Sequence, residues 1–117
     1  MSVIRRAVID VGTNSVKLLV ADVLGREIHP VCEESKQTRL GQGFFETHQL
    51  LPEAIAKTAA AVAKFVAQAQ QLQTRDIRVI ATSAARDARN ADELRRGLME
   101  ASGLPVEIIT GEQEAGW

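Results

Sequence analysis

Two apolar runs separated by a four-residue turn open this sequence and constrain its fold more than any other feature. Residues 7–11 form a near-continuous apolar run, which is typical of a strand covered on both faces. Segment 12–15 (Gly-Thr-Asn-Ser) is turn chemistry, and an alternating apolar pattern resumes at 16–21. A third run at 28–32 follows another turn at Gly25. The pattern predicts three antiparallel strands joined by tight turns.

Helices and strands alternate along the rest of the chain. Segment 35–49 has no clean period and is predicted to be a loop. An amphipathic helix is predicted to begin at Pro52, after Leu51 in the cap position, because apolar residues then recur at three- and four-residue spacing. Apolar runs at 77–82 and 106–109 predict two more strands. The apolar face predicted for the helix consists of Ile55, Ala59, Val62, Val66 and Ala69.

A second helix is predicted after Asn90. The Asn90-Ala-Asp-Glu93 pattern resembles a capping box, in which the Asn90 side chain accepts the Glu93 N–H and the Glu93 carboxylate bonds the Asn90 N–H. Gly103 supplies a left-handed cap, and Pro105 prevents continuation. Residues 110–112 look like the start of a further helix.

The predicted element order defines a fold class. The predicted order is strand, strand, strand, helix, strand, helix, strand. It requires parallel pairing of the later strands, because each is reached through a helical crossover. The chain of 117 residues is therefore expected to form one mixed α/β domain. This is the element order of a ribonuclease-H-like sheet, although periodicity alone leaves open which strands are neighbours.

Composition excludes several classes of protein. A net charge of −1 and only four aromatic residues argue against nucleic-acid binding. The lone Cys32 excludes an internal disulfide and a cysteine-based metal site. No apolar stretch resembles a signal or a membrane span, so we expect a cytoplasmic location without a membrane partner. His29 and His48 have no second ligand at metal spacing and are expected at the surface.

The first turn carries the first candidate site. Asp10 lies near the carboxyl end of a predicted buried strand, where open α/β sheets bind ligands. Gly12 permits close backbone approach, and Thr13, Asn14 and Ser15 add small donors. Such a turn can hold an anion, with Asp10 binding a hydrated Mg²⁺ on the phosphate. The same residues are equally suited to a hairpin without a ligand, so both interpretations stay open.

Two later segments carry further charged candidates. Arg86, within the segment 81–90 (ATSAARDARN), can bind phosphate oxygens bidentately, and its alternative is a solvated surface position. A surface position is favoured for Arg89. Glu112 and Glu114 follow the fifth strand and either stabilise a first helical turn or supply a general base.

Taken together, residues 7–22, 81–94 and 106–115 resemble the N-terminal part of the exopolyphosphatase / guanosine pentaphosphate phosphohydrolase (Ppx/GppA) family. That family belongs to the actin-like, sugar-kinase and DnaK-type chaperone superfamily. The resemblance implies that the sheet is part of the first lobe of an actin-like two-lobe fold. It also implies a Mg²⁺-dependent hydrolase that releases terminal phosphate from polyphosphate or guanosine pentaphosphate, with water as acceptor and a homodimeric full-length protein.

The resemblance assigns roles residue by residue. Glu114 matches the general base and Arg86 the arginine of the catalytic cleft, while Asp10 matches the metal-binding position. Glu112 and Thr82 are additional candidates. The positions that match phosphate-binding residues are Gly12, Thr13, Asn14, Ser15, Lys17 and Asn90.

Two departures from the family pattern bear on activity. Gly116 stands where relatives usually have arginine, and the sequence given ends at Trp117, before a second phosphate loop (Asp-apolar-Gly-Gly-Gly-Ser) and a second lobe. We therefore expect residues 1–117 to be the N-terminal part of lobe I of a longer phosphatase and to hydrolyse little alone. The alternatives are a kinase relative of the same fold and a non-catalytic phosphate- or nucleotide-binding module.

Overall fold

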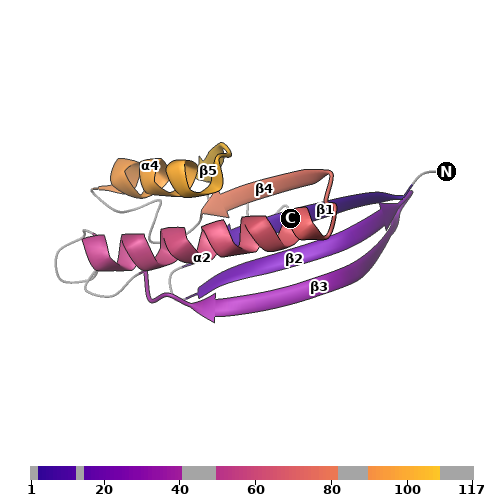
Figure 1. Ribbon diagram of the computed structural model, residues 1–117, viewed down its shortest axis with the longest axis horizontal. Helices are drawn as coiled ribbons and strands as arrows, with labels where there is room; N and C mark the ends of the chain where they lie inside the picture. Colours follow the sequence, from indigo (N-terminus) through magenta and orange to yellow (C-terminus); the bar gives the residue numbers. More distant parts are fainter. Residues whose placement is uncertain (1–2, 13–14, 41–49, 82–89, 109–117) are drawn as a thin grey trace.

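The structure is a computed structural model that describes residues 3–12, 15–40, 50–81 and 90–108. Five strands form a single sheet in the order β3-β2-β1-β4-β5, with two helices beside it (Figure 1). The elements are β1 (Ile4–Val11), β2 (Ser15–Leu24), β3 (Glu27–Gln37), α2 (Pro52–Gln71), β4 (Asp76–Ala81), α4 (Ala91–Ser102) and β5 (Val106–Ile108).

The strand pairing confirms the predicted mixed sheet. β1 pairs antiparallel with β2, and β2 pairs antiparallel with β3. β4 then pairs parallel with β1, and β5 parallel with β4, each after a helical crossover. The order and directions are those of a ribonuclease-H-like sheet.

The third strand is longer than its sequence pattern predicts. A loop was predicted from Ser35 onward, but β3 continues to Gln37, which pairs with Ser15 of β2. β3 is the edge strand, and nearly all its side chains are exposed, so its length depends on backbone pairing with β2 and not on an apolar pattern. The prediction that strand structure ends before Ser35 is therefore wrong.

Both described helices cover one face of the sheet. Alternate residues of the strands, such as Ile9, Leu18 and Val79, form one buried cluster with side chains from α2 and α4. Ile55 and Ala59, predicted on the core face of α2, are only partly buried at the edge of this cluster. The side chains that α2 buries are Ala54, Thr58, Ala61, Val62, Phe65, Val66 and Ala69.

The helix termini confirm one prediction and overturn another. α2 begins as predicted, with Leu51 before Pro52 and no side-chain cap bond. The predicted capping box at Asn90 is wrong, because the Asn90 amide does not accept the Glu93 N–H. The Glu93 N–H donates instead to the Asn90 main-chain oxygen (3.0 Å), and the Asn90 side chain bonds Leu50.

Two glycines, one inside α4 and one immediately after it, should respond oppositely to replacement by alanine. Gly103 has the predicted left-handed conformation (φ 70°), and its N–H donates to the Met99 carbonyl at 2.8 Å. Gly103→Ala should lower the free energy of unfolding by about 1–2 kcal/mol, because a Cβ is strained there. Gly97 lies inside α4, where a Cβ would meet Ile55 Cγ2 at 3.4 Å, an ordinary contact. Gly97→Ala should therefore raise stability by about 0.5–1 kcal/mol in urea unfolding. If both substitutions raised, or both lowered, the free energy of unfolding, these assignments would be contradicted.

Arg5 joins the sheet to the end of α2. Its Nε and Nη2 donate to the Asp22 carboxylate at 2.7 and 3.1 Å, and its Nη1 donates to the Leu72 carbonyl at 2.9 Å. The Arg5 carbonyl in turn accepts the Arg75 N–H at 2.9 Å. One side chain thus links β1, β2 and the helix terminus by charge-assisted hydrogen bonds.

This linkage predicts an acid-sensitive contribution to stability. The hydrogen bonds from Arg5 hold the pKa of the Asp22 carboxyl below its ordinary value of 3.8. A lowered pKa in the folded state stabilises the fold above pH 3.8, and this contribution is lost as the pH falls below that value. Asp22→Asn should therefore be less stable than the unmodified protein at pH 7, with a gap that shrinks below pH 3.8. A gap that stays constant from pH 7 into acid would contradict this account.

Neither described helix is long and apolar enough to cross a membrane. Cys32 forms no disulfide, and its sulfur lies 3.5 Å from the Gln68 side-chain nitrogen.

Candidate functional site

The turn between β1 and β2 is a tight hairpin. Val11 and Val16 are the last pair of the strand ladder, and the Gly12 N–H donates to the Ser15 carbonyl at 2.9 Å. A Cβ on Gly12 would lie 3.1 Å from that carbonyl oxygen, so a side chain would crowd the turn. The predicted hairpin connection between β1 and β2 is therefore confirmed. It is compatible with a phosphate at the same turn, and Thr13 and Asn14 lie outside the described residues.

Asp10 and Lys17 lie side by side next to this turn. They are directly paired across β1 and β2, and residues paired in this way point to the same face of a sheet. Because Ile9 and Val11 point into the core beneath the helices, Asp10 points to the opposite face. Asp10 is half-buried and Lys17 is exposed. An acidic and a basic group thus flank the glycine turn on one face.

Three parallel strands end at the same level of the sheet. Val11 of β1 is in register with Ala81 of β4, and Ala81 is in register with Ile108 of β5. The segments that follow these strands, 12–15, 82–89 and 109–117, therefore all leave the sheet at one edge. This edge, the carboxyl ends of β1, β4 and β5, is where open α/β sheets bind ligands. Thr82, Arg86, Glu112 and Glu114 belong to these segments and lie outside the described residues.

Asn90 immediately precedes α4. Its Oδ1 accepts the Leu50 N–H at 2.8 Å, and its Nδ2 donates to the Leu50 carbonyl at 2.9 Å. The same nitrogen lies 3.4 Å from Glu93 Oε2. These contacts bring together the residue before α4 and the segment before α2. Whether Asn90 also contacts phosphate stays a prediction.

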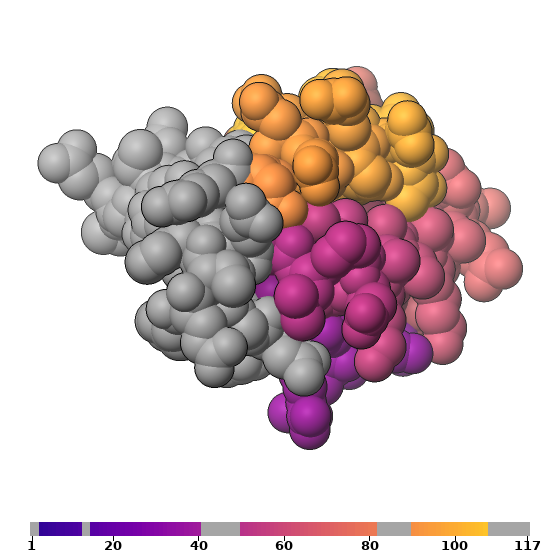
Figure 2. All heavy atoms as spheres, turned by 90° about the vertical axis from the view of Figure 1, so that its left-hand side faces the viewer, coloured from indigo at the N-terminus to yellow at the C-terminus, as the bar shows by residue number. Residues whose placement is uncertain are grey.

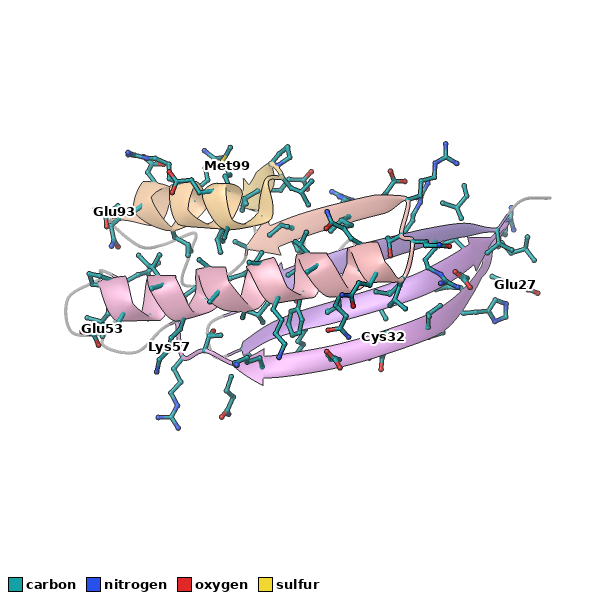
Figure 3. The ribbon with its side chains drawn as sticks, in the orientation of Figure 1. Glu27, Cys32, Glu53, Lys57, Glu93 and Met99 are labelled. Atoms are coloured by element: carbon teal, nitrogen blue, oxygen red, sulfur yellow. The ribbon has the colours of Figure 1, made fainter. Side chains whose placement is uncertain are left out.

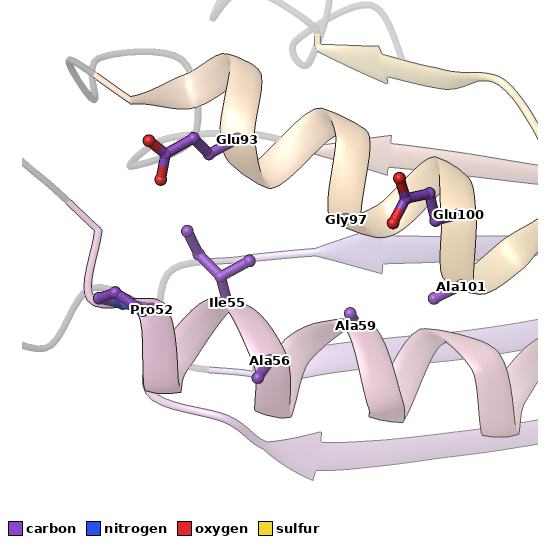
Figure 4. A pocket seen from close by; sticks show the side chains of 8 residues that line it. All are labelled: Pro52, Ile55, Ala56, Ala59, Glu93, Gly97, Glu100 and Ala101. Carbon is purple, nitrogen blue, oxygen red and sulfur yellow. The ribbon is translucent and has the colours of Figure 1, made fainter.

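A groove between α2 and α4 does not fit a phosphate. Among the residues that the structure describes, its walls are mostly small apolar side chains, and the only charged ones that line it are Glu93 and Glu100 (Figure 4). Two carboxylates without a cation disfavour an anion. The residues lining the groove are Pro52, Ile55, Ala56, Ala59, Glu93, Gly97, Glu100 and Ala101.

The predictions about metal ligands concern His29 and His48. His29 is exposed, as predicted, and its Nε2 lies 3.2 Å from Glu27 Oε2. Glu27 lies at the far end of the sheet from Glu53 and Glu93, which mark the starts of the two helices (Figure 3). Within the described ranges, no three His, Cys, Asp or Glu side chains form a metal-binding group. His48 lies outside these ranges.

Comparison with known proteins then decides the family. The model of the Ppx/GppA phosphatase family matches residues 19–117. The chain belongs to the Ppx/GppA phosphatase family. The match includes the segments that follow β4 and β5, which carry Arg86 and Glu114.

Relatives from two branches of the Ppx/GppA family resemble the chain. Exopolyphosphatase 2 of Mycobacterium tuberculosis (strain ATCC 25618 / H37Rv) is 41% identical over 98% of this chain and 39% of its own length. The guanosine-5'-triphosphate,3'-diphosphate pyrophosphatase of Vibrio parahaemolyticus is 30% identical over 93% of this chain and 22% of its own length. The chain therefore spans about two fifths of the mycobacterial relative's length, or less for the Vibrio relative.

A solved structure supports the same Ppx/GppA fold. The Ppx/GppA family member of Aquifex aeolicus superimposes with a TM-score of 0.90 and is 31% identical, over 97% of this chain and 37% of that one. The mixed sheet is therefore the Ppx/GppA version of the actin-like fold.

The structure unites only part of the predicted Ppx/GppA site. It brings together Asp10, Gly12, Ser15 and Lys17 at the first turn. It also reveals a partnership between Asn90 and Leu50 that no sequence pattern indicated, because the two residues are 40 positions apart.

Proposed function

We propose that the full protein containing this chain is a phosphohydrolase that releases terminal phosphate from inorganic polyphosphate, guanosine pentaphosphate or both. The proposal rests on one observation: β1, β4 and β5 are parallel, and their carboxyl ends lie in register at the same edge of the sheet. Three segments bearing candidate phosphate-binding and catalytic residues leave the sheet there. Membership of a phosphatase family and relatives that include an exopolyphosphatase and a guanosine pentaphosphate pyrophosphatase support the substrate class.

The residues at the first turn fit a magnesium ion held together with substrate. Mg²⁺ is usually bound by one or two carboxylates, with substrate phosphates and waters completing its shell. Asp10 supplies one carboxylate on the sheet face opposite the core cluster, and Lys17 supplies a positive charge beside it. Bound Mg²⁺ would neutralise charge on the phosphate oxygens. In this proposal Asp10 holds the ion and the turn holds the phosphate.

Phosphate binding and proton transfer are assigned to residues of this chain. The glycine turn presents backbone and side-chain donors from Gly12, Thr13, Asn14 and Ser15 to the phosphate. Arg86 binds oxygens of the terminal phosphoryl group bidentately. Glu114 orients a water and accepts its proton as the water oxygen bonds to phosphorus. The bond from phosphorus to the bridging oxygen breaks, and the shortened substrate leaves with that oxygen and its electron pair.

Catalysis in this proposal requires more of the protein than the chain supplies. Because the chain spans 39% of the mycobacterial relative, we place residues 1–117 in the N-terminal part of lobe I. A second phosphate loop and a second lobe from the rest of the protein complete the cleft. We further propose a homodimer in the cytoplasm, and little hydrolysis by residues 1–117 alone.

Phosphate release by the full natural protein tests the proposal. Orthophosphate is measured with long-chain polyphosphate or guanosine pentaphosphate as substrate, with added Mg²⁺ and after chelation. We expect release that depends on Mg²⁺, and we expect Asp10→Asn to need a higher Mg²⁺ concentration for half-maximal rate. An unchanged Mg²⁺ requirement would remove Asp10 from the metal site. No release from either substrate would overturn the proposed function.

A further inference from the structure

A second groove lies between α2 and the carboxyl end of β3. It has a volume of about 500 Å³, and its walls come from residues 34–37 of β3 and from Lys64 and Phe65 of α2. Gln37, at the end of β3, is paired with Ser15 of the glycine turn. The groove therefore begins next to the turn that is proposed to hold the terminal phosphate.

Positive charge is concentrated along this groove. Lys36 and Lys64 line it, and both are exposed. Lys57, near the start of α2 (Figure 3), is exposed as well. It is seven residues before Lys64, so it leaves the helix on the same side and about 10 Å nearer the helix start. These three lysines form a lysine strip between the start of α2 and the end of β3.

The ammonium groups of the lysine strip are available to an anion. None of the ion pairs formed within the described part of the chain includes a lysine of the strip. Two carboxylates are near it, Glu34 in the groove and Glu53 one helical turn before Lys57. Arg39, two residues after β3, is exposed and adds a fourth cation. The region is therefore positive, although the whole chain has a net charge of −1.

The two sides of α2 carry opposite charge. Seen end-on, the start of α2 lies between α4 and the purple strand atoms (Figure 2). Among the described lining residues, the groove on the α4 side has only Glu93 and Glu100 as charged groups, whereas the groove on the β3 side has two lysines and one glutamate. A polyanion that extends from the glycine turn is therefore attracted to the β3 side and repelled from the α4 side.

The chemistry of the lysine strip fits inorganic polyphosphate better than a single-stranded nucleic acid. Lysine binds phosphate oxygens as a compact point charge. Proteins that bind single strands combine such charges with aromatic rings on which the bases stack. Phe65, the aromatic residue that lines the groove, is buried (3% exposed) and offers no ring surface for stacking. A chain of phosphates needs only the charges.

We propose that Lys36, Lys57 and Lys64 bind the part of a polyphosphate chain that lies beyond its terminal phosphate, while the end of the chain is held at the glycine turn. This inference rests on the proposed function and deepens it, because it makes long-chain polyphosphate the preferred substrate. Guanosine pentaphosphate and tripolyphosphate carry only short runs of phosphate. They cannot contact the turn and the whole strip together, so they gain less from it.

Two triple variants of the full natural protein test the lysine strip. The strip variant replaces its three lysines by glutamine. The control variant replaces three exposed arginines outside the groove, so both variants lose the same positive charge. Exposed substitutions of this kind have small effects on folding. The substitutions are Lys36→Gln, Lys57→Gln and Lys64→Gln in the strip variant, and Arg26→Gln, Arg95→Gln and Arg96→Gln in the control.

Steady-state release of orthophosphate is measured with long-chain polyphosphate and with tripolyphosphate. In the strip variant, KM for long-chain polyphosphate should rise about tenfold or more, and it should depend less steeply on salt, because fewer cations contact the polyanion. KM for tripolyphosphate should rise much less. The control variant should keep both constants of the unmodified protein.

A change of opposite sign is expected at Glu34. Glu34→Gln removes the carboxylate that lines the groove, so the repulsion between it and the phosphate chain is lost. KM for long-chain polyphosphate should therefore fall in this variant. A rise would contradict the placement of the chain in the groove.

Each other outcome overturns a defined part of the account. An unchanged KM for long-chain polyphosphate in the strip variant would refute the strip, and an equal rise in the control would reduce its effect to net charge. An equal rise for tripolyphosphate would place the lysines at the terminal phosphate. Inhibition by single-stranded RNA that is lost in the strip variant would assign the groove to nucleic acid. An unmodified protein that releases no phosphate from any substrate would refute the proposed function itself, a failure that is recognised without any variant.

Discussion

Glu114→Gln is expected to lower kcat for phosphate release by about 10²–10⁴-fold, the range by which a positioned general base accelerates proton transfer. Glutamine keeps the size and shape of the side chain, but its amide cannot accept the proton of the attacking water. KM should change little, because the substrate is held by the turn residues and Arg86 in the proposed site. Steady-state release of orthophosphate by the full natural protein measures both constants.

Glu112→Gln is the matched control for this prediction. It removes a carboxylate two positions earlier in the same segment and leaves Glu114 intact. We expect a much smaller loss of kcat for Glu112→Gln than for Glu114→Gln. The reverse order would assign the general base to Glu112, and full activity in both variants would remove this segment from the proton transfer.

Leu94→Ala is expected to have the largest effect on stability, a loss of about 2–5 kcal/mol in the free energy of unfolding. Leu94 is fully buried (0% exposed) where α4 packs into the core cluster. Truncation leaves a cavity among side chains that hold the helix against the sheet. Such a loss is a large part of the roughly 5–15 kcal/mol by which domains are stable.

Met99→Ala provides the comparison on the same helix. Met99 is 42% exposed, and it points outward from α4 (Figure 3). Its truncation should change the free energy of unfolding by no more than about 0.5 kcal/mol, the usual range for surface sites. Urea unfolding followed by circular dichroism measures both variants. Similar losses for Leu94→Ala and Met99→Ala would contradict the packing of α4 described above.

Local sequence patterns predicted the strands, helices and turns that depend on residues close together in the sequence. The apolar run 7–11 became the central strand β1, and proline at the first helical position marked the start of α2 at Pro52. Gly103 ended α4 in the left-handed conformation because only a residue without Cβ adopts it at little cost. The order of these elements predicted that the later strands pair in parallel, but it left open which strands are neighbours, and the structure places β4 beside β1.

Features that depend on contacts between residues far apart in the sequence could not be predicted from local patterns. β3 extends to Gln37 because β2 offers backbone partners, and its exposed side chains carry no pattern. Asn90 has the sequence context of a capping box, yet its amide bonds Leu50, 40 positions away. A hydrogen-bonding side chain can satisfy local or distant backbone groups, and the folded packing decides between them.

Local sequence patterns likewise predicted only part of the candidate site. Periodicity and turn chemistry located the glycine turn, and strand register placed Asp10 beside Lys17 on one face. Arg86 and Glu114 owe their proposed roles to the family resemblance, since an isolated arginine or glutamate on a loop fits a surface position equally well. The common level of three strand ends is what links these residues to the turn.

Isotope incorporation from ¹⁸O-labelled water tests the central claim most directly. The full natural protein is incubated with unlabelled polyphosphate or guanosine pentaphosphate in labelled water, and the released orthophosphate is analysed by mass spectrometry. A hydrolase with water as acceptor predicts one ¹⁸O atom in each phosphate released. Transfer of the phosphoryl group to an added alcohol, carboxylate or nucleotide acceptor, without label in orthophosphate, would contradict the account and favour a kinase relative of the same fold.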